Sequence, residues 1–247
     1  MMFNNKYPYR SSMSQTMQKS FKDLAQQIKK KINPKKILEI GSNDGSFLKN
    51  FDKKISIGVE PCANVEKITK RQKFNTIPKY WNLKLAKSIL KKYGEIDLIY
   101  SANTLSHIKD LNDVFKSIKI VLSSNGILIL EDPSLLECLK RNTYDQFYNE
   151  HIYVFSYLSL KNILKRFDLE IYKIENLDIH GGSNRYFIKN MNNKISIDRS
   201  VIKQQIKEKK YGLDKKSTYF KFKKRVENSK KKLISILKFC KYKKKKI

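Results

Sequence analysis

The stretch Ile-Leu-Glu-Ile-Gly-Ser-Asn-Asp-Gly at residues 37–45 constrains the fold more than any other part of the chain. An apolar run that ends in an acid and passes into a glycine-punctuated loop is typical of a first β-strand leading into a nucleotide-binding turn. Gly41 and Gly45 carry no Cβ and tolerate positive φ, so the backbone there can approach a ligand closely. We expect a helix from about Ser46 to Phe51, with its N-terminal amides facing that ligand.

A second acid follows at the distance expected for a nucleotide-binding fold. Ile-Gly-Val-Glu60-Pro61 ends another apolar run about twenty residues after the loop. An acid at this point usually hydrogen-bonds ribose hydroxyls. The loop reads Glu-x-Gly-x-x-x-Gly rather than Gly-x-Gly-x-x-Gly, and it resembles motif I of S-adenosylmethionine-dependent methyltransferases. The alternative interpretation is an ordinary βα turn of an α/β protein.

Helical and strand patterns alternate along the chain. Apolar periodicity and turn signals predict helices at 14–31, 62–71, 83–92, 110–122, 135–139 and 159–167, and strands at 36–40, 55–59, 76–77, 96–100, 127–131, 169–174 and 184–188. Asn125-Gly126 is expected to form a turn before the fifth strand. This alternation predicts an α/β fold with a Rossmann-like, doubly wound and mostly parallel sheet.

The same pass along the chain suggests how it is organised. We expect a methyltransferase-like core over residues 1–195, in which 1–34 form an N-terminal arm and a helix. A polar, aromatic-rich insert is expected over 144–157, so the predicted fold carries a helical insert after the fifth strand. Residues 196–247 are predicted to form a basic helical segment of two helices, with 19 basic and 3 acidic residues from Ser200 onward.

Composition argues against several classes of protein. The 247 residues are 40% hydrophobic, which is typical of a globular chain. No apolar run approaches the roughly eighteen residues of a membrane span, and the N-terminus lacks the apolar region of a signal peptide, so a cytoplasmic location is expected. Cys62, Cys138 and Cys240 are far apart and form no Cys-x-x-Cys pair, so we expect no metal site and no disulfide framework.

The formal net charge of +30 raises the question of a nucleic-acid partner. Lysine accounts for 46 of the 53 basic residues and arginine for only 7. Arginine is the residue that binds phosphates and bases with two parallel hydrogen bonds, so its scarcity weakens this interpretation. A bias of codon usage towards lysine is the preferred explanation, and a polyanion partner with steeply salt-dependent binding is the alternative.

All three histidines fall where a ligand of such a sheet would lie. His107 follows the fourth strand, His151 belongs to the insert after the fifth, and His180 precedes the last strand. A histidine titrates near neutral pH and can remove a proton from carbon. Glu150 stands beside His151, and Tyr148 could donate to a developing oxyanion. For each histidine taken singly, the alternative is a hydrogen-bonded loop residue.

Six motifs then occur in order along the chain. They are Tyr7-Pro-Tyr-Arg-Ser-Ser, Glu39-Ile-Gly-Ser-Asn-Asp-Gly, Gly58-Val-Glu-Pro, Asn103-Thr-Leu-Ser-His-Ile, Asp145-Gln-Phe-Tyr-Asn-Glu-His and His180-Gly-Gly-Ser-Asn-Arg. Together they resemble the sugar-nucleotide C-methyltransferases of deoxysugar biosynthesis, over residues 6–190 and more weakly in the basic helices. The resemblance implies a class I methyltransferase fold, S-adenosylmethionine as cofactor, and methyl transfer to a carbon next to the ketone of a nucleotide-linked 4-keto-deoxyhexose through an enolate.

The resemblance also implies roles for individual residues. His151 would be the general base, with Glu150 and Tyr148 as its neighbours. His107 would lie near the sugar ketone, and Tyr7 would reach the site from the arm. The cofactor would be lined by Gly41, Ser42, Asn43, Gly45, Glu60, Pro61 and Asn103.

The chain also departs from the family pattern. Members usually begin with a cysteine-rich zinc module and continue into a second α/β segment with a Gly-x-Gly-Ala-type loop, and neither is found here; Lys79 stands where an acid is frequent. We therefore expect an incomplete C-terminal domain. Two alternatives stay open, namely a methyltransferase for RNA or another small molecule and a non-catalytic remnant that binds partners. The oligomeric state is not predicted.

Overall fold

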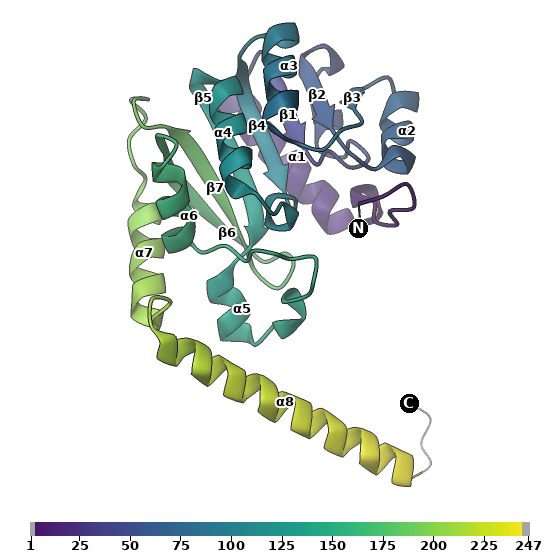
Figure 1. The fold of residues 1–247 in the computed structure, drawn as a ribbon, viewed down its shortest axis with the longest axis vertical. Helices are drawn as coiled ribbons and strands as arrows, with labels where there is room; N and C mark the ends of the chain where they lie inside the picture. The colour runs from purple at the N-terminus through teal and green to yellow at the C-terminus, as the bar shows by residue number, and fades with distance from the viewer. Residues whose placement is uncertain (1–2, 244–247) are drawn as a thin grey trace.

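The computed structural model describes residues 3–243, and within them seven strands form one sheet in the order β3-β2-β1-β4-β5-β7-β6 (Figure 1). The strands are β1 Ile37–Ile40, β2 Ser56–Val59, β3 Asn75–Ile77, β4 Ile96–Ala102, β5 Leu122–Pro133, β6 Leu169–Leu177 and β7 Ser183–Asn190. Strand β7 runs antiparallel to both of its neighbours, while the pairs from β3 to β5 are parallel. The predicted α/β class and the mostly parallel sheet are confirmed.

Helices cover both faces of this sheet. They are α1 Gln15–Lys31, α2 Ala63–Arg71, α3 Leu83–Tyr93, α4 Leu111–Val121, α5 Leu135–Arg141, α6 Tyr157–Lys165, α7 Arg199–Tyr211 and α8 Lys216–Tyr242. Helices α3, α4 and α6 pack on one face, and α1 packs on the other. Successive strand residues point to opposite faces, so Leu98 belongs to the core under α1 and Ile99 to the opposite core. Burial on both faces explains the continuous apolar runs of the central strands.

Polar side chains determine where several helices begin. Ser14, Asn82, Asp110 and Asp198 each accept a hydrogen bond from a backbone N–H in the first turn of α1, α3, α4 and α7, respectively. Such caps satisfy amides that have no partner within the helix. These local signals explain why the predicted helix starts agree with the structure.

Two local predictions are wrong. Residues 46–51 do not form an α-helix but a single 3-10 turn at Leu48–Asn50, because Phe51 is already extended and Asp52 caps a second short turn. The predicted turn at Asn125-Gly126 is instead an irregularity inside β5. Leu122 already pairs with Ile96 of β4 and Ile127 pairs with Leu98, so residues 123–126 bulge out of the ladder.

The helical structure of the insert after α5 is limited to one 3-10 turn, Tyr144–Gln146. Phe155 forms an isolated bridge with Ser134, and the other residues of the insert are irregular.

The basic C-terminal segment divides into two parts. Helix α7 packs against α6 and β6, and the buried carboxylate of Glu208 accepts the amides of Tyr157 and Leu158 at 2.8 and 3.0 Å. Helix α8 has no buried residue and extends away from the sheet in Figure 1. The end of the lysine run, residues 244–246, lies outside the described residues. Across 3–243, no helix is both long and apolar enough to cross a membrane.

Candidate active site

A cavity of about 830 Å³ opens at the carboxyl ends of the parallel strands. Residues directly following β1, β2 and β4 line it, which is the edge where α/β sheets bind ligands. The N-terminal arm contributes Phe3 and Tyr7 to its wall, and the insert after α5 contributes residues between Gln146 and Ile152. Three segments far apart in the chain therefore enclose one space.

The glycine loop after β1 is fixed against the ends of β2 and β4. Gly41 has φ +74°, and a Cβ placed there would lie 2.2 Å from Thr104 Oγ1. No other residue fits this backbone without displacing the threonine. The amides of Gly41 and Ser42 both donate to the carbonyl of Val59, at 2.8 and 3.1 Å. The loop is thus held close to the cavity by the strand beside it.

Glu60 connects this loop to the start of α2. Its Oε2 accepts the amide of Asn43 at 2.9 Å and its Oε1 accepts the amide of Cys62 at 2.8 Å. Burial raises the pKa of the Glu60 carboxyl, and these hydrogen bonds offset part of that effect. Each oxygen keeps a further lone pair for a hydroxyl donor in the cavity.

Glu39, at the end of β1, is a buried acid with one carboxylate oxygen that accepts no hydrogen bond. Its Oε2 has no hydrogen-bond partner within residues 3–243, although the side chain lines the cavity. Burial, together with the nearby carboxylates of Glu60 and Asp44, raises the pKa of Glu39 well above its usual value. A chain of net charge +30 thus gathers three acids around its glycine loop, and a cationic ligand would relieve their repulsion.

Two histidines face each other on the opposite side of the cavity. The ring centroids of His107 and His151 are 4.8 Å apart. Nδ1 of His107 lies 2.7 Å from the carbonyl of Glu150, and Nδ1 of His151 lies 2.8 Å from that of Gln146. Because a carbonyl oxygen only accepts hydrogen bonds, each Nδ1 carries a proton, and Nε2 of His151 is the nitrogen of that ring that can act as a base. His107 makes a further hydrogen bond to the backbone of Asn103. Burial lowers the pKa of His107.

Aromatic side chains complete this side of the site. The Tyr148 ring lies 4.4 Å from that of His151, and Phe3 meets His107 edge-on at 5.1 Å. Tyr7 packs on Phe3 at 5.3 Å. Burial raises the pKa of Tyr7 to about 12, so its phenol stays protonated and can donate a hydrogen bond.

Comparison with known protein families shows which family has a site of this kind. Residues 9–174 match the family described as "Methyltransferase domain", and this match covers more than half of the chain. The chain belongs to this methyltransferase family. A second match, described as "C-methyltransferase C-terminal domain", spans residues 178–247.

Known relatives of this methyltransferase agree with the assignment. The C-methyltransferase NovU of Streptomyces niveus is 30% identical over 149 residues, which are 60% of this chain and 36% of NovU. The chain therefore spans about a third of the length of that relative. A solved protein of Pyrococcus horikoshii has a TM-score of 0.56 at 16% identity, over 74% of this chain and 94% of its own. An S-adenosylmethionine-dependent methyltransferase from Clostridium acetobutylicum has a TM-score of 0.52 at 16% identity, over 69% and 91%. These structures share the fold.

Most of the predicted site residues of the methyltransferase line this cavity at the sheet edge. They are Tyr7, Gly41, Asn43, Glu60, Pro61, Asn103, His107, Tyr148, Glu150 and His151. Ser42 and Gly45 do not line it. The hydroxyl of Ser42 points towards Gly58, where a Cβ would lie 2.6 Å from it, and Gly45 faces Thr69. Both support the loop from behind.

Other lining residues were not predicted to belong to the site. Glu39 is part of the glycine motif in the sequence, but only its burial beside the cavity in the structure identifies it as a site residue. Tyr80 and Trp81 follow β3 at the same edge of the sheet, and this position in the sequence could have identified them as site residues. Lys79, which stands where related proteins often have an acid, does not line the cavity. The third histidine, His180, which the sequence had already placed on the ligand side of the sheet, lines the cavity as well. Over the described residues 3–243, no group of three or more histidine, cysteine or acidic side chains could hold a metal ion.

Proposed function

We propose that this protein transfers a methyl group from S-adenosylmethionine to a carbon next to the ketone of a nucleotide-linked 4-keto-deoxysugar. The observation that carries the proposal is the fixed tautomer of His151, whose Nε2 is available as a base in the same cavity as the glycine loop and Glu60. The match to a C-methyltransferase C-terminal domain and the similarity to NovU support transfer to carbon.

The residues at the glycine loop fit S-adenosylmethionine. The cofactor carries an ammonium and a sulfonium, and the unpartnered Oε2 of Glu39 offers a buried acceptor for a cation. Glu60 is held by two backbone amides and would accept from ribose hydroxyls. Gly41, Asn43, Pro61 and Asn103 would line the remaining cofactor surface. When bound, the cofactor supplies an electrophilic methyl group.

His151 would generate the nucleophile. A carbon next to a ketone becomes nucleophilic when its proton leaves and the ketone oxygen takes the negative charge. We assign the removal of this proton to Nε2 of His151, because Nδ1 is occupied by the carbonyl of Gln146. Glu150 fixes the second imidazole, His107, through its backbone carbonyl. The enolate carbon would then attack the methyl group, and sulfur would keep the electron pair of the broken carbon–sulfur bond, so that S-adenosylhomocysteine leaves.

Donors for the enolate oxygen lie around the base. Tyr7 and Tyr148 carry phenols whose pKa burial raises, so both remain protonated at neutral pH. His107 could donate only from a protonated Nε2, which its lowered pKa disfavours. We therefore propose the tyrosines as the hydrogen-bond donors and His107 as a neutral wall of the sugar site.

Two measurements test the function. The protein is incubated with methyl-labelled S-adenosylmethionine and a panel of nucleotide-linked 4-keto-hexoses, and the products are analysed by mass spectrometry. One methyl group gained on a sugar carbon is the expected result. Label on RNA, or on none of the sugars, would overturn the proposal.

The base step can be followed without methyl transfer. In deuterated buffer with S-adenosylhomocysteine, the wild-type protein should exchange the α-proton of the keto sugar for deuterium. His151→Asn should abolish this exchange, because the amide is not basic. Exchange that continues at the wild-type rate in this variant would remove His151 from its assigned role.

A further inference from the structure

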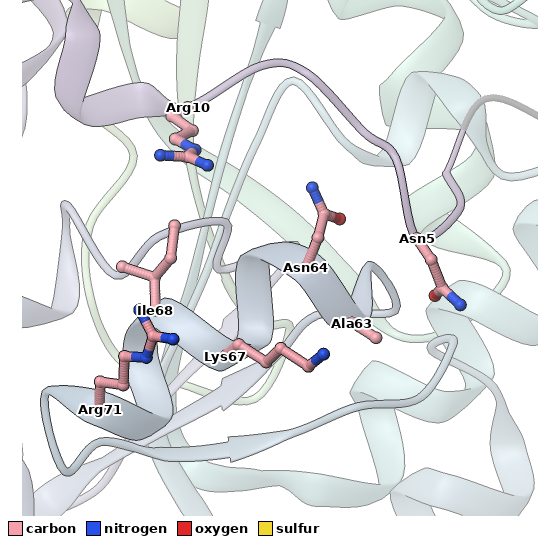
Figure 2. A pocket seen from close by; sticks show the side chains of 7 residues that line it. All are labelled: Asn5, Arg10, Ala63, Asn64, Lys67, Ile68 and Arg71. Atoms are coloured by element: carbon pink, nitrogen blue, oxygen red, sulfur yellow. The ribbon is translucent and has the colours of Figure 1, made fainter.

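A second cavity, with basic walls, lies between the N-terminal arm and α2. It has a volume of about 300 Å³ and is lined by Asn5 and Arg10 of the arm and by Asn64, Lys67 and Arg71 of the helix. Figure 2 shows Arg10 and Asn5 on the arm above α2, with Asn64 on the helix between them. The proposed methyl transfer uses none of these side chains.

The cations of this cavity are not neutralised within the chain. Lys67 and Arg71 are four residues apart and thus share one side of α2, where like charges repel. Arg10 adds a third positive charge from the arm. In the part of the chain that the structure describes, none of the three forms an ion pair with an acid. Such a cluster favours an anion with several negatively charged oxygens.

The arm holds its part of the cavity in a fixed place. Asn64 Nδ2 donates to the carbonyl of Tyr7 at 2.8 Å, and Asn43 Nδ2 donates to the carbonyl of Tyr9 at 3.2 Å. Arg10 directly follows the second of these contacts. The backbone that carries the cation is therefore ordered before any ligand arrives, which lowers the entropic cost of binding.

Asn64 also has a side-chain oxygen that accepts no hydrogen bond. Its Oδ1 is buried and has no hydrogen-bond partner within residues 3–243. A buried carbonyl oxygen without a donor is unfavourable, and a ligand hydroxyl would satisfy it. Three cations beside an acceptor without a hydrogen-bond donor match a ligand that combines phosphate groups with hydroxyls.

We infer that this basic cavity binds the diphosphate of a nucleoside diphosphate, the group that links a nucleotide to its sugar. The inference rests on the proposed function, since it assigns the charged part of the same substrate. Tyr7 connects the two cavities, because its side chain lines the central one while Asn64 of the basic one holds its carbonyl. The arm is thus a shared wall, with the imidazoles on one side and the cations on the other.

Titration calorimetry at low salt with inorganic pyrophosphate and with a nucleoside diphosphate tests the site. Lys67→Ala and Arg71→Ala should each weaken binding about tenfold or more, because each removes a charged hydrogen-bond donor. Lys70→Ala makes the same change of charge on an exposed position of α2 outside the cavity, and should bind as the wild type does. Absence of binding, or an equal loss in Lys70→Ala, would overturn the inference.

Kinetics separate this inference from the proposed function. In the methyl-transfer assay, Lys67→Ala and Arg71→Ala should raise KM for the sugar nucleotide with little change in kcat, since they lie away from the reacting carbon. Methyl transfer with an unchanged KM would refute the diphosphate site and leave the proposed function standing. Specific pyrophosphate binding without methylation of any keto sugar would support the site and refute the function.

Discussion

The imidazoles of His107 and His151 lie 4.8 Å apart, and each is oriented by a backbone carbonyl at Nδ1. The two residues come from different segments, one following β4 and the other in the insert after α5. The insert is thereby fixed over the sheet edge, and the ring of His107 is also hydrogen-bonded to the backbone of Asn103.

Replacement of His151 by alanine should lower kcat roughly 10²–10⁴-fold, the usual contribution of a general base. Because the substitution leaves a gap where the ring stood, added imidazole should restore part of the activity. Steady-state kinetics with and without imidazole measure both effects, and circular dichroism checks the fold. Unchanged turnover would contradict the assignment.

Glu60→Gln should weaken binding of S-adenosylhomocysteine about tenfold or more. The carboxylate accepts one amide at each oxygen, whereas a carboxamide has a single acceptor and would present its NH₂ group to the other amide. Calorimetry measures the affinity. Glu66→Gln, with the same change of charge on α2, serves as the control. Equal weakening in both variants would point to general electrostatics instead.

Gly41→Ala and Gly45→Ala separate steric clash from backbone strain. Both glycines have positive φ, but the added Cβ lies 2.2 Å from Thr104 Oγ1 at Gly41 and 3.2 Å from the nearest atom, on Thr69, at Gly45. Strain alone costs about 1–3 kcal/mol, and the clash adds to it only at Gly41. Thermal unfolding should show the larger loss for Gly41→Ala. Equal losses would mean that the threonine moves aside freely.

Asp132 should make stability depend on pH in the opposite sense to an ordinary paired carboxylate. Burial raises the pKa of Asp132 to about 8, and the nearby Ser106 offsets only part of this. The folded state then keeps a proton that the unfolded chain releases near its ordinary pKa of about 4. The contribution of protonated Asp132 to the free energy of unfolding is therefore complete below about pH 4 and is lost as the pH rises through about 8.

Asp132→Asn should therefore remove this dependence and raise Tm relative to the wild type in mildly alkaline buffer. Thermal unfolding across this pH range gives the slope. Asp23→Asn, at an exposed position of α1, should leave the slope unchanged. A wild-type slope that persists in Asp132→Asn would place the titrating group elsewhere.

Arg185 on β7 holds a buried ion pair. Its Nε lies 2.9 Å from Oε2 of the fully buried Glu131, and its other nitrogens reach Glu175 and Ser20. Arg185→Met should cost about 3–5 kcal/mol, because it leaves the Glu131 carboxylate buried without a cation and with only the Tyr100 hydroxyl, at 3.4 Å, as a donor. Chemical denaturation measures the loss. The double variant with Glu131→Met should recover most of it, and a double variant no better than the single one would contradict this account.

The sequence predicted well those features that depend on neighbours in the chain. Apolar runs and side-chain caps identify the strands and most helices, because periodicity and capping act over a few residues. The helix predicted after Gly45 failed for a tertiary reason. Phe47, Leu48 and Phe51 are all drawn into the core under α1, and the chain turns again at Asp52 before a longer helix can form.

By itself, the sequence determined the order of the elements and hence the edge of the sheet where Gly41, Glu60 and Asn103 meet, since parallel strands end together. It could not show that Glu39 is buried without a partner or that the arm places Tyr7 over this edge. Those relations, like the facing rings of His107 and His151, join segments far apart in the chain. Contacts of this kind come from packing and desolvation, which only the tertiary structure decides.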